Sequence, residues 1–270
     1  RDYHRVLKQR ARRVLDRLRA QRPGVEGRVF VDAGPIAERS LAVAAGLGWV
    51  GRNGCLIVPG VGSYVVLCEI VCSAELAPGP ADGAGGPPER PDPSAEPASA
   101  PVGCGDCRAC VEACPSGACR GDGLIDCRLC LSHQSIENRG RVPPELWARM
   151  GGRLFGCDAC QAACPYNRGA VAGDAELTGL ARPRALPSAA DVLAWAPSDW
   201  DAATRGRALR RATWEMWLRN AALSAGCGAD ASVVPLLEGL VGGDGAEPPA
   251  GRTVAEAARW ARERLAGPGR

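Results

Sequence analysis

Two cysteine runs constrain this chain more than any other feature. The first has the spacing C-x2-C-x2-C-x3-C-P and consists of Cys104, Cys107, Cys110 and Cys114, followed by Pro115. The second consists of Cys157, Cys160 and Cys164, followed by Pro165. In bacterial ferredoxins the first spacing supplies three ligands to one 4Fe-4S cluster and a fourth to another cluster. The pattern therefore predicts two clusters and electron transfer.

The second run is one cysteine short, because each four-iron cube needs four thiolates. The segment between the runs offers two candidates for the missing ligand, Cys127 and Cys130. The arrangement that completes both cubes gives one cluster the ligands Cys104, Cys107, Cys110 and Cys164. The other cluster then has Cys114, Cys157 and Cys160, with either Cys127 or Cys130.

Other uses of the cysteines fit the spacing less well. A structural zinc site takes two C-x-x-C pairs and closes at four ligands, which leaves no use for a third closely spaced cysteine. A disulfide framework is typical of short secreted chains, and no apolar signal segment is seen here. Outside the cluster sets, the remaining cysteines are expected to be buried apolar residues without a role: Cys55, Cys68, Cys72, Cys119, Cys227 and whichever of Cys127 and Cys130 is not a ligand.

Length and charge limit the number of domains and the kinds of partner that the chain can have. The 270 residues allow one large domain or two ordinary ones, and no apolar run reaches the roughly 18 residues of a membrane span. The net charge of +3 hides two basic groups, one within residues 1–30 and one at Arg205, Arg207, Arg210 and Arg211. Either group could contact nucleic-acid phosphates, or it could be a solvated helix face.

The first part of the chain is predicted to mix helices and strands. An amphipathic helix over residues 4–20 has Leu7, Ala11, Val14 and Leu18 on one stripe. Strands are predicted over 28–31, 56–58 and 64–71, and a helix is predicted with Pro35 in its first turn and Gly46 at its end. So few strands suggest an incomplete sheet. Because the chain begins at Arg1 without an initiator Met, we expect an N-terminal truncation.

Three further regions follow. Residues 77–101 contain eight prolines and are predicted to be a disordered insert. A cluster region covers 102–172, and short helices are expected over 189–195, 210–225, 232–240 and 254–265. Paired short helices of this kind are typical of HEAT-type repeats, although a plain helical cap would look the same.

Asp32 lies where the first strand is predicted to give way to a helix. Such a position often faces a ligand crevice. Considered alone, however, the residue is better explained as an ordinary helix N-cap. The glycine-rich stretch from Ala45 to Asn53 does not have the G-x-G-x-x-G form that a nucleotide fingerprint requires.

Several motifs, taken in order, resemble epoxyqueuosine reductases. They are Asp2-Tyr3-His4, Val31-Asp32-Ala33-Gly34-Pro35, Gly46-Leu47-Gly48-Trp49-Val50-Gly51-Arg52-Asn53, and Gly62-Ser63-Tyr64 leading to Glu69. The cysteine runs, Cys130-Leu131-Ser132 and Trp217-Leu218-Arg219-Asn220 agree with the same pattern. The resemblance covers nearly the whole chain except the proline-rich insert.

The resemblance implies a cytoplasmic oxidoreductase of queuosine biosynthesis. Such an enzyme uses cobalamin and two 4Fe-4S clusters to reduce epoxyqueuosine to queuosine at the wobble position of tRNA. The implied fold class is α+β. Its implied domains are a partial cobalamin-binding α/β domain over 1–76, a ferredoxin-like two-cluster domain over 102–172 and a HEAT-like helical tail over 173–270. The implied partners are the tRNA anticodon stem-loop and an external electron donor such as flavodoxin or ferredoxin, with no membrane and a monomeric state.

Residue roles follow from the same resemblance. Cys130 becomes the fourth ligand of the second cluster, and Asp32 becomes the proton donor for the departing epoxide oxygen. The expected cobalamin contacts are Asp32, Arg52, Asn53, Gly62, Ser63, Tyr64 and Ser132. Three alternatives remain, namely a two-cluster ferredoxin-type electron carrier, a cobalamin enzyme like the reductive dehalogenases, and a non-catalytic tRNA-binding protein with structural clusters.

Overall fold

The computed structural model describes residues 2–32, 34–76, 103–169, 173–178, 187–242 and 247–267. The chain forms two compact units. Unit 1 contains residues 1–113, 119–125 and 159–182, and unit 2 contains residues 114–118, 126–158 and 183–270. The predicted disordered insert lies outside the described residues, and the predicted domain boundaries stay predictions.

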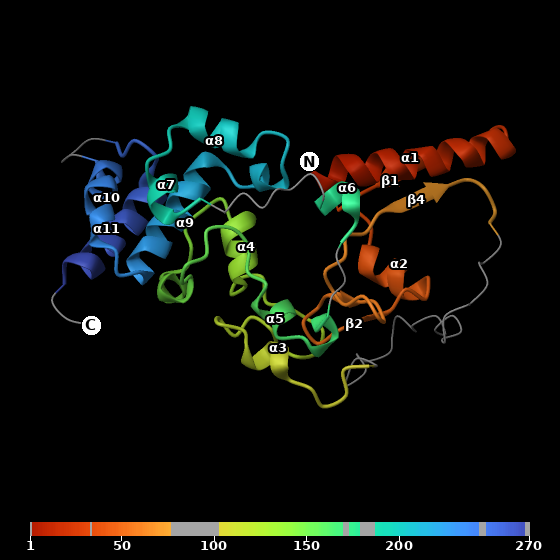
Figure 1. The fold of residues 1–270 in the computed structure, drawn as a ribbon, viewed down its shortest axis with the longest axis horizontal. Helices are drawn as coiled ribbons and strands as arrows, with labels where there is room; N and C mark the ends of the chain where they lie inside the picture. Colours follow the sequence, from red (N-terminus) through yellow and green to blue (C-terminus); the bar gives the residue numbers. More distant parts are fainter. Residues whose placement is uncertain are drawn as a thin grey trace. The chain divides into compact units, whose positions relative to one another are not determined.

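Unit 1 is built on a long helix and two small antiparallel strand pairs (Figure 1). The helix α1 (Tyr3–Gln21) packs along β1 (Gly27–Phe30) and β4 (Glu69–Cys72), which pair with each other. A second pair joins β2 (Trp49–Val50) to β3 (Leu56–Ile57) beside α2 (Glu38–Ala44). The mixed helix-and-sheet composition is confirmed. Among the described residues every strand pairing is antiparallel, so the parallel pairing of an α/β domain is not seen.

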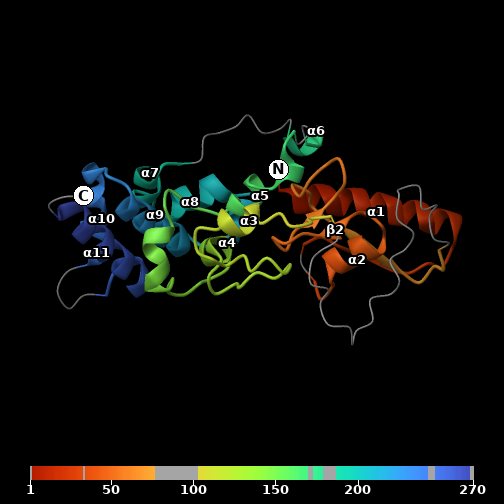
Figure 2. The ribbon, with the colours of Figure 1, turned by 90° about the horizontal axis from the view of Figure 1, so that it is seen from below.

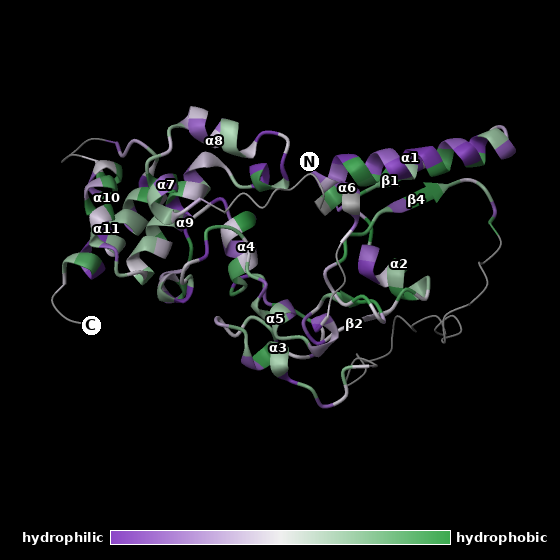
Figure 3. Ribbon diagram, in the orientation of Figure 1, coloured by the Kyte–Doolittle hydropathy of each residue, from purple (hydrophilic) through white to green (hydrophobic). Residues whose placement is uncertain are grey.

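The buried stripe of α1 differs from the predicted one. Val6, Ala11 and Leu15 are buried, whereas Val14 is 55% exposed. Leu15 lies over Gly27, where a side chain on the strand would collide with it. The predicted stripe was wrong at Val14 because the strands, which the helix pattern does not reveal, determine which face is covered. Figure 3 shows the hydrophilic residues that dominate the rest of this helix.

Two other local predictions were wrong. Pro35 precedes α2 and is not in its first turn, since the helix begins at Glu38. The predicted strand over 64–71 is a strand only from Glu69 onward. The strands at 28–31 and 56–58 were correctly placed to within one residue, as β1 and β3. The turn after α2 is closed by Gly46 at a φ of 75°, a conformation that glycine adopts without a steric penalty.

Unit 1 is completed by short elements around the cysteines. These are α3 (Ala109–Glu112), α5 (Ala159–Ala162), the 3-10 helix η2 (Pro165–Asn167) and α6 (Ala175–Thr178). The helices α3 and α5 pack against each other, although their sequences lie about fifty residues apart. This packing joins the first cysteine run to the second.

Unit 2 is helical. Its elements are α4 (Leu131–Ile136), η1 (Pro144–Arg149), α7 (Ala189–Leu193), α8 (Pro197–Thr204), η3 (Ala208–Arg211), α9 (Trp214–Cys227), η4 (Ala231–Val233), α10 (Val234–Val241) and α11 (Arg252–Ala266). The central helix is α9, which packs against α7 and α11, while α10 packs against α11 (Figure 2). Buried residues run without interruption from Met216 to Gly226, as expected for a helix surrounded by protein. The predicted helices are confirmed, except that the one predicted over 210–225 begins only at Trp214, and their HEAT-like character stays a prediction.

No helix in the described ranges combines the length and the apolar character that crossing a membrane requires.

Candidate functional site

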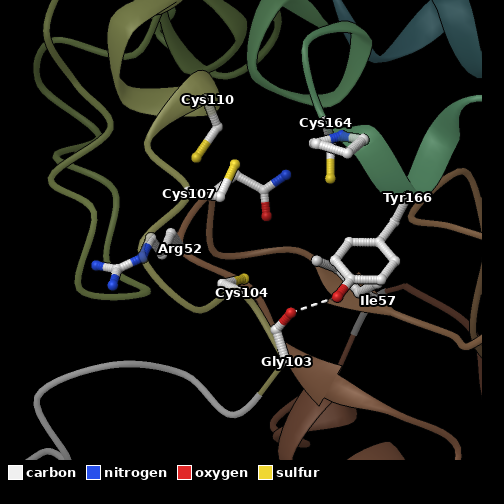
Figure 4. Close-up of a pocket in the computed structure, with 10 residues that line it drawn as sticks. Arg52, Ile57, Gly103, Cys104, Cys107, Cys110, Cys164 and Tyr166 are labelled. Carbon is white, nitrogen blue, oxygen red and sulfur yellow. Dashed lines mark hydrogen bonds between the residues drawn. The ribbon is translucent and has the colours of Figure 1, made fainter.

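Four cysteines line one pocket of about 210 Å³ in unit 1. They are Cys104, Cys107, Cys110 and Cys164, the set predicted to hold the first cluster. Figure 4 shows their side chains around the same space. Cys110 and Cys164 are buried, whereas Cys107 is exposed. The structure thus brings together ligands from both cysteine runs.

The loop that carries Cys104 and Cys107 is held by aromatic side chains. The Tyr166 hydroxyl donates a hydrogen bond to the carbonyl oxygen of Gly103 (Figure 4). The Trp49 ring packs against Gly103 so closely that a side chain there would overlap it. Gly103 also has a φ of 100°, which favours glycine. Trp49 and Tyr166 meet edge to face at 5.1 Å, and they fix the start of the cysteine loop.

Arg52 and Asn53 come from the turn between β2 and β3 and line the same pocket. The Arg52 guanidinium donates to the carbonyl oxygens of Gly121 and Gly105, at 2.8 Å in each case. Gly105 lies between two of the cysteines, so Arg52 holds their loop. The Nε of Arg52 and the Nδ2 of Asn53 are buried, and neither has a hydrogen-bond partner among the described residues.

The chemistry of this pocket fits an iron–sulfur cluster. Four thiols and two unpartnered N–H donors suit a group that binds thiolates and accepts hydrogen bonds at sulfur. Burial raises the pKa of the Cys110 thiol, so a cationic ligand is needed to hold it as a thiolate near neutral pH. Among the described residues, no three His, Cys, Asp or Glu side chains are close enough to bind one metal ion. In a four-iron cube each thiolate binds a different iron, so the sulfurs lie farther apart than around one ion.

The residues of the predicted second cluster are divided between the two units. Cys114, Cys130 and Cys157 belong to unit 2, and Cys160 belongs to unit 1, in α5. Cys130 is the N-cap residue of α4, and Cys127 is exposed. This ligand set, including the choice of Cys130 over Cys127, stays a prediction.

Asp32 is surrounded by side chains from the start of α1. It receives a hydrogen bond from the Tyr3 hydroxyl, and the Nε2 of His4 lies 3.4 Å from its Oδ2. The His4 Nδ1 lies 2.7 Å from the Oδ1 of Asp2. The helix N-cap explanation of Asp32 is wrong, because α2 begins six residues later and has Ala37 at its N-cap. The carboxyl group is 48% exposed and therefore accessible.

The backbone at Asp32 also departs from ordinary helix or strand geometry. Its φ is 51°, the only positive value at a described non-glycine residue. This left-handed conformation is uncommon, although Asp adopts it more readily than most residues. Such conformations cluster at functional sites, so the geometry agrees with a functional role for the residue.

Sequence reasoning missed a third carboxyl group near this position. Glu69 pairs with Phe30 across the β1–β4 ladder, two residues before Asp32. Its Oε2 is buried with no hydrogen-bond partner among the described residues. Burial raises the pKa of Glu69, and the negative charges of Glu38 and Asp32 add to the effect. The resemblance named Glu69 without a role, and no local pattern indicates its surroundings.

The other predicted cobalamin contacts have different surroundings. Ser63 is buried, and its hydroxyl is bonded to Gln161 at 3.0 Å and to the Asn167 amide at 2.9 Å. Gly62 lies beside the Asn167 side chain, where a Cβ would collide with it. Tyr64 is 50% exposed. Ser132 lies in unit 2, in the first turn of α4.

The basic group of the tail is largely paired with acids. Arg205 and Arg210 form ion pairs with Asp201, and Arg211 forms one with Glu137. Arg210 also lies over the Trp200 ring at 4.6 Å. Arg207 is exposed, with no ion pair among the described residues. Exposed pairs of this kind contribute little stability, so a phosphate could compete for these arginines.

Comparison with known proteins agrees with this site. A model of the 4Fe-4S double cluster binding domain matches residues 103–167, so an iron–sulfur domain is confirmed. A model described as epoxyqueuosine reductase QueG, DUF1730, matches residues 1–33. The epoxyqueuosine reductase of Pseudomonas aeruginosa is 36% identical over 244 residues, which cover 89% of this chain and 61% of that protein.

Solved structures agree with the sequence comparisons. A crystal structure of epoxyqueuosine reductase with an epoxyqueuosine-modified tRNA-Tyr stem loop matches 99% of this chain and 64% of its own, with a TM-score of 0.76 and 26% identity. The epoxyqueuosine reductase of Bacillus subtilis, in a structure with its aspartate-bearing catalytic loop swung out of the active site, gives a TM-score of 0.75 and 25% identity. It covers 99% of this chain and 64% of its own.

These matches extend along nearly the whole of this chain. The chain spans about three fifths of the length of the curated relatives. In its motifs, its iron–sulfur domain and its fold, the chain is similar to the epoxyqueuosine reductases over nearly its whole length.

Proposed function

We propose that this protein reduces epoxyqueuosine to queuosine in tRNA, with two 4Fe-4S clusters and cobalamin as cofactors. The observation that carries the proposal is the pocket of four cysteines from both runs, in a chain 36% identical to an epoxyqueuosine reductase. The alternative of an electron carrier accounts for the cysteines, but it gives no role to Asp32 or to the residues around it.

The reaction removes the epoxide oxygen as water and leaves an alkene, which takes two electrons and two protons. Side chains cannot supply the electrons, so cofactors must provide them. When bound, cobalamin supplies a reduced cobalt centre that can transfer electrons to the epoxide carbon. Clusters held by the cysteines would supply the electrons, and the proposed external donor is a protein of the flavodoxin or ferredoxin class.

Asp32 is the proposed proton donor. Its accessible carboxyl group would protonate the oxygen as the C–O bond breaks, and general acid catalysis of this kind contributes about 100- to 10,000-fold. Tyr3 holds one carboxyl oxygen by a hydrogen bond. His4 is oriented by Asp2 and directs its Nε2 toward the same oxygen, at 3.4 Å. His4 is therefore placed to return a proton to Asp32 after turnover.

An exposed segment of unit 1, residues 61–66, would suit part of a corrin ring. Val61, Tyr64 and Val66 are each at least 38% exposed, and together they offer apolar contact and one phenol group from a single segment. Ser63 is not suited to this role, because its hydroxyl already bonds within the protein. We propose that Asp32 and Tyr64 contact cobalamin and that Gly62 and Ser63 support the segment that carries Tyr64.

The proposed nucleic-acid partner is the anticodon stem-loop of tRNA. The related structure with a tRNA stem loop supports this choice. Exposed basic side chains with no ion pair among the described residues lie along α1, at Arg5, Lys8, Arg12, Arg13 and Arg17, and Arg207 is a further candidate in unit 2. We propose that some of them contact phosphates. We propose that the protein acts in the cytoplasm, where its proposed tRNA substrate occurs, and that it is a monomer.

The test uses cells that lack their own epoxyqueuosine reductase. The protein is expressed in these cells, and the nucleosides of the total tRNA are separated by chromatography and identified by mass spectrometry. The proposal predicts that epoxyqueuosine disappears and queuosine appears. Persistent epoxyqueuosine, with the protein present and loaded with iron, would contradict it and favour the electron carrier.

A further inference from the structure

Asn53 has one amide edge fixed and the other directed to no protein group. The side chain is 3% exposed. Its Oδ1 accepts a hydrogen bond from the Cys55 backbone N–H at 3.1 Å. This bond assigns the oxygen to that edge of the amide, so Nδ2 occupies the opposite edge. There it is buried, with no partner in the part of the chain that the structure describes.

The turn that carries Asn53 is rigidly closed. The Gly51 N–H donates to the Cys55 carbonyl oxygen at 2.8 Å, and the Gly54 N–H donates to the Gly51 carbonyl oxygen at 2.9 Å. A side chain at Gly51 would contact the Asn53 Oδ1 and overlap Ile57. The orientation of the Asn53 amide is therefore built into the fold and does not depend on a flexible rotamer.

Arg52 repeats the pattern. Its two terminal nitrogens are used by the carbonyl oxygens of Gly121 and Gly105, while its Nε is buried without a partner among the described residues. Both side chains line the pocket of the four cysteines. The sequence analysis expects Arg52 and Asn53 to contact cobalamin. In the structure both residues line the same pocket as the four cysteine thiols.

Two buried N–H donors without acceptors cost free energy unless a ligand supplies acceptors. Sulfur atoms of an iron–sulfur cluster accept such bonds, and these bonds are among the factors that set its reduction potential. We propose that the Asn53 Nδ2 and the Arg52 Nε donate hydrogen bonds to sulfur atoms of the cluster held by Cys104, Cys107, Cys110 and Cys164, and that they raise its reduction potential. This inference rests on the proposed cluster.

The direction of the effect follows from charge. Reduction adds one electron and hence one negative charge to the cluster, without making or breaking a bond in the protein. An N–H donor stabilises the more negative state more strongly. Removing a donor therefore favours the oxidised state and lowers the midpoint potential.

The test compares two Asn→Ala variants in reconstituted full-length protein. Asn53→Ala removes the unpartnered donor. Asn167→Ala makes the same change at an amide whose N–H groups are already bonded to Ser63 and Gln161. Redox titration followed by electron paramagnetic resonance gives the midpoint potentials. We expect Asn53→Ala to shift the redox equilibrium of one cluster at least about threefold toward the oxidised form. This corresponds to a midpoint potential lower by about 30 mV, because a tenfold change for one electron is about 59 mV. Asn167→Ala should shift the midpoint potential less.

A second measurement uses the wild-type protein and so does not depend on how a variant folds. Electron–nuclear double resonance of the reduced cluster, with asparagine 15N-labelled in its side-chain amide, should show a coupling to that nitrogen. Equal potentials in the two variants, or a wild-type spectrum without the amide coupling, would overturn the inference. Failure of the proposed function is distinguishable, because epoxyqueuosine would then persist although the wild-type protein holds its clusters and the two variants still differ in potential.

Discussion

The side-chain amide nitrogen of Asn220 lies 2.9 Å from the carbonyl oxygen of Ser135. The same nitrogen donates to the Leu154 carbonyl oxygen at 2.9 Å. Its neighbour Arg219, only 2% exposed, donates to the carbonyl oxygens of Gln134, Asn138 and Gly140. Two adjacent residues of α9 thus hold α4, which follows Cys130, and the segment that leads to Cys157.

This network predicts a large loss of stability on truncation. Asn220→Ala leaves two buried carbonyl oxygens without these donors, and each such group costs about 1–3 kcal/mol. We expect the free energy of unfolding to fall by at least about 2 kcal/mol in chemical denaturation. Glu215→Ala, on the exposed side of the same helix, should change it by less than about 0.5 kcal/mol. Equal losses in the two variants would show that the network is not stabilising.

The network also explains why Arg219 is tolerated in the interior. Burial lowers its pKa to about 10, which leaves the guanidinium charged at neutral pH. The carbonyl oxygens around it compensate part of the cost of burying that charge. The motif Trp217-Leu218-Arg219-Asn220 belongs to the resemblance in the sequence, but only the structure shows what these side chains bind.

The part of the candidate site that could be predicted from the sequence is the part that depends on the spacing of residues close together in the chain. The cysteine spacing grouped the four thiols that line the pocket in unit 1, since cluster ligands have a recognisable pattern; that these thiols hold one cluster stays a prediction. The pattern could not show that Asn53 reaches the same pocket, because that depends on a turn between two strands of two residues each, too short for any periodicity. It also could not exclude Asp32 as a helix cap, because propensity does not locate the first residue of α2.

Asp32 is expected to be required for turnover. Asp32→Asn keeps the size of the side chain but cannot donate a carboxyl proton, so the rate should fall about 100- to 10,000-fold. Iron content, the cobalamin spectrum and tRNA affinity should stay at wild-type values. The control is Asp16→Asn, an exposed carboxylate of α1, which should keep its activity. Full activity of Asp32→Asn would remove this carboxyl group from the mechanism.

Cys107 is expected to be required for one cluster. Cys107→Ser replaces an exposed pocket thiol of unit 1, and the protein should lose the signal of one of the two proposed clusters in anaerobic reconstitution with iron and sulfide. Cys68→Ser changes another exposed cysteine of unit 1 that lies outside the pocket, and its iron content should equal that of the wild type. Iron analysis and electron paramagnetic resonance make the comparison. An unchanged spectrum in Cys107→Ser would contradict the ligand assignment.

The contact between α1 and α6 is expected to weaken in acid. Arg10 pairs with Asp174 at 2.6 Å and with Glu176 at 2.7 Å. The hydrogen bond from Arg10 lowers the pKa of Asp174 to about 2. Since this value lies below the ordinary one near 3.9, the pair stabilises the folded state above about pH 4. That contribution is lost as the pH falls from about 4 to about 2.

Carboxyl-carbon nuclear magnetic resonance measures this titration directly. In Arg10→Gln the Asp174 carboxyl should titrate closer to its ordinary value, and high salt should reduce the difference because both side chains are exposed. Identical titration curves in the wild type and in Arg10→Gln would show that the ion pair does not form in solution.

The most direct test of the account is a single-turnover reaction with purified components. Protein reconstituted with iron, sulfide and cobalamin, and reduced anaerobically, is mixed with tRNA that carries epoxyqueuosine, and the nucleosides are identified by mass spectrometry. The account predicts stoichiometric conversion to queuosine, with the epoxide oxygen lost as water, and no conversion when cobalamin is omitted. Unchanged epoxyqueuosine in the presence of cobalamin and both reduced clusters would contradict it.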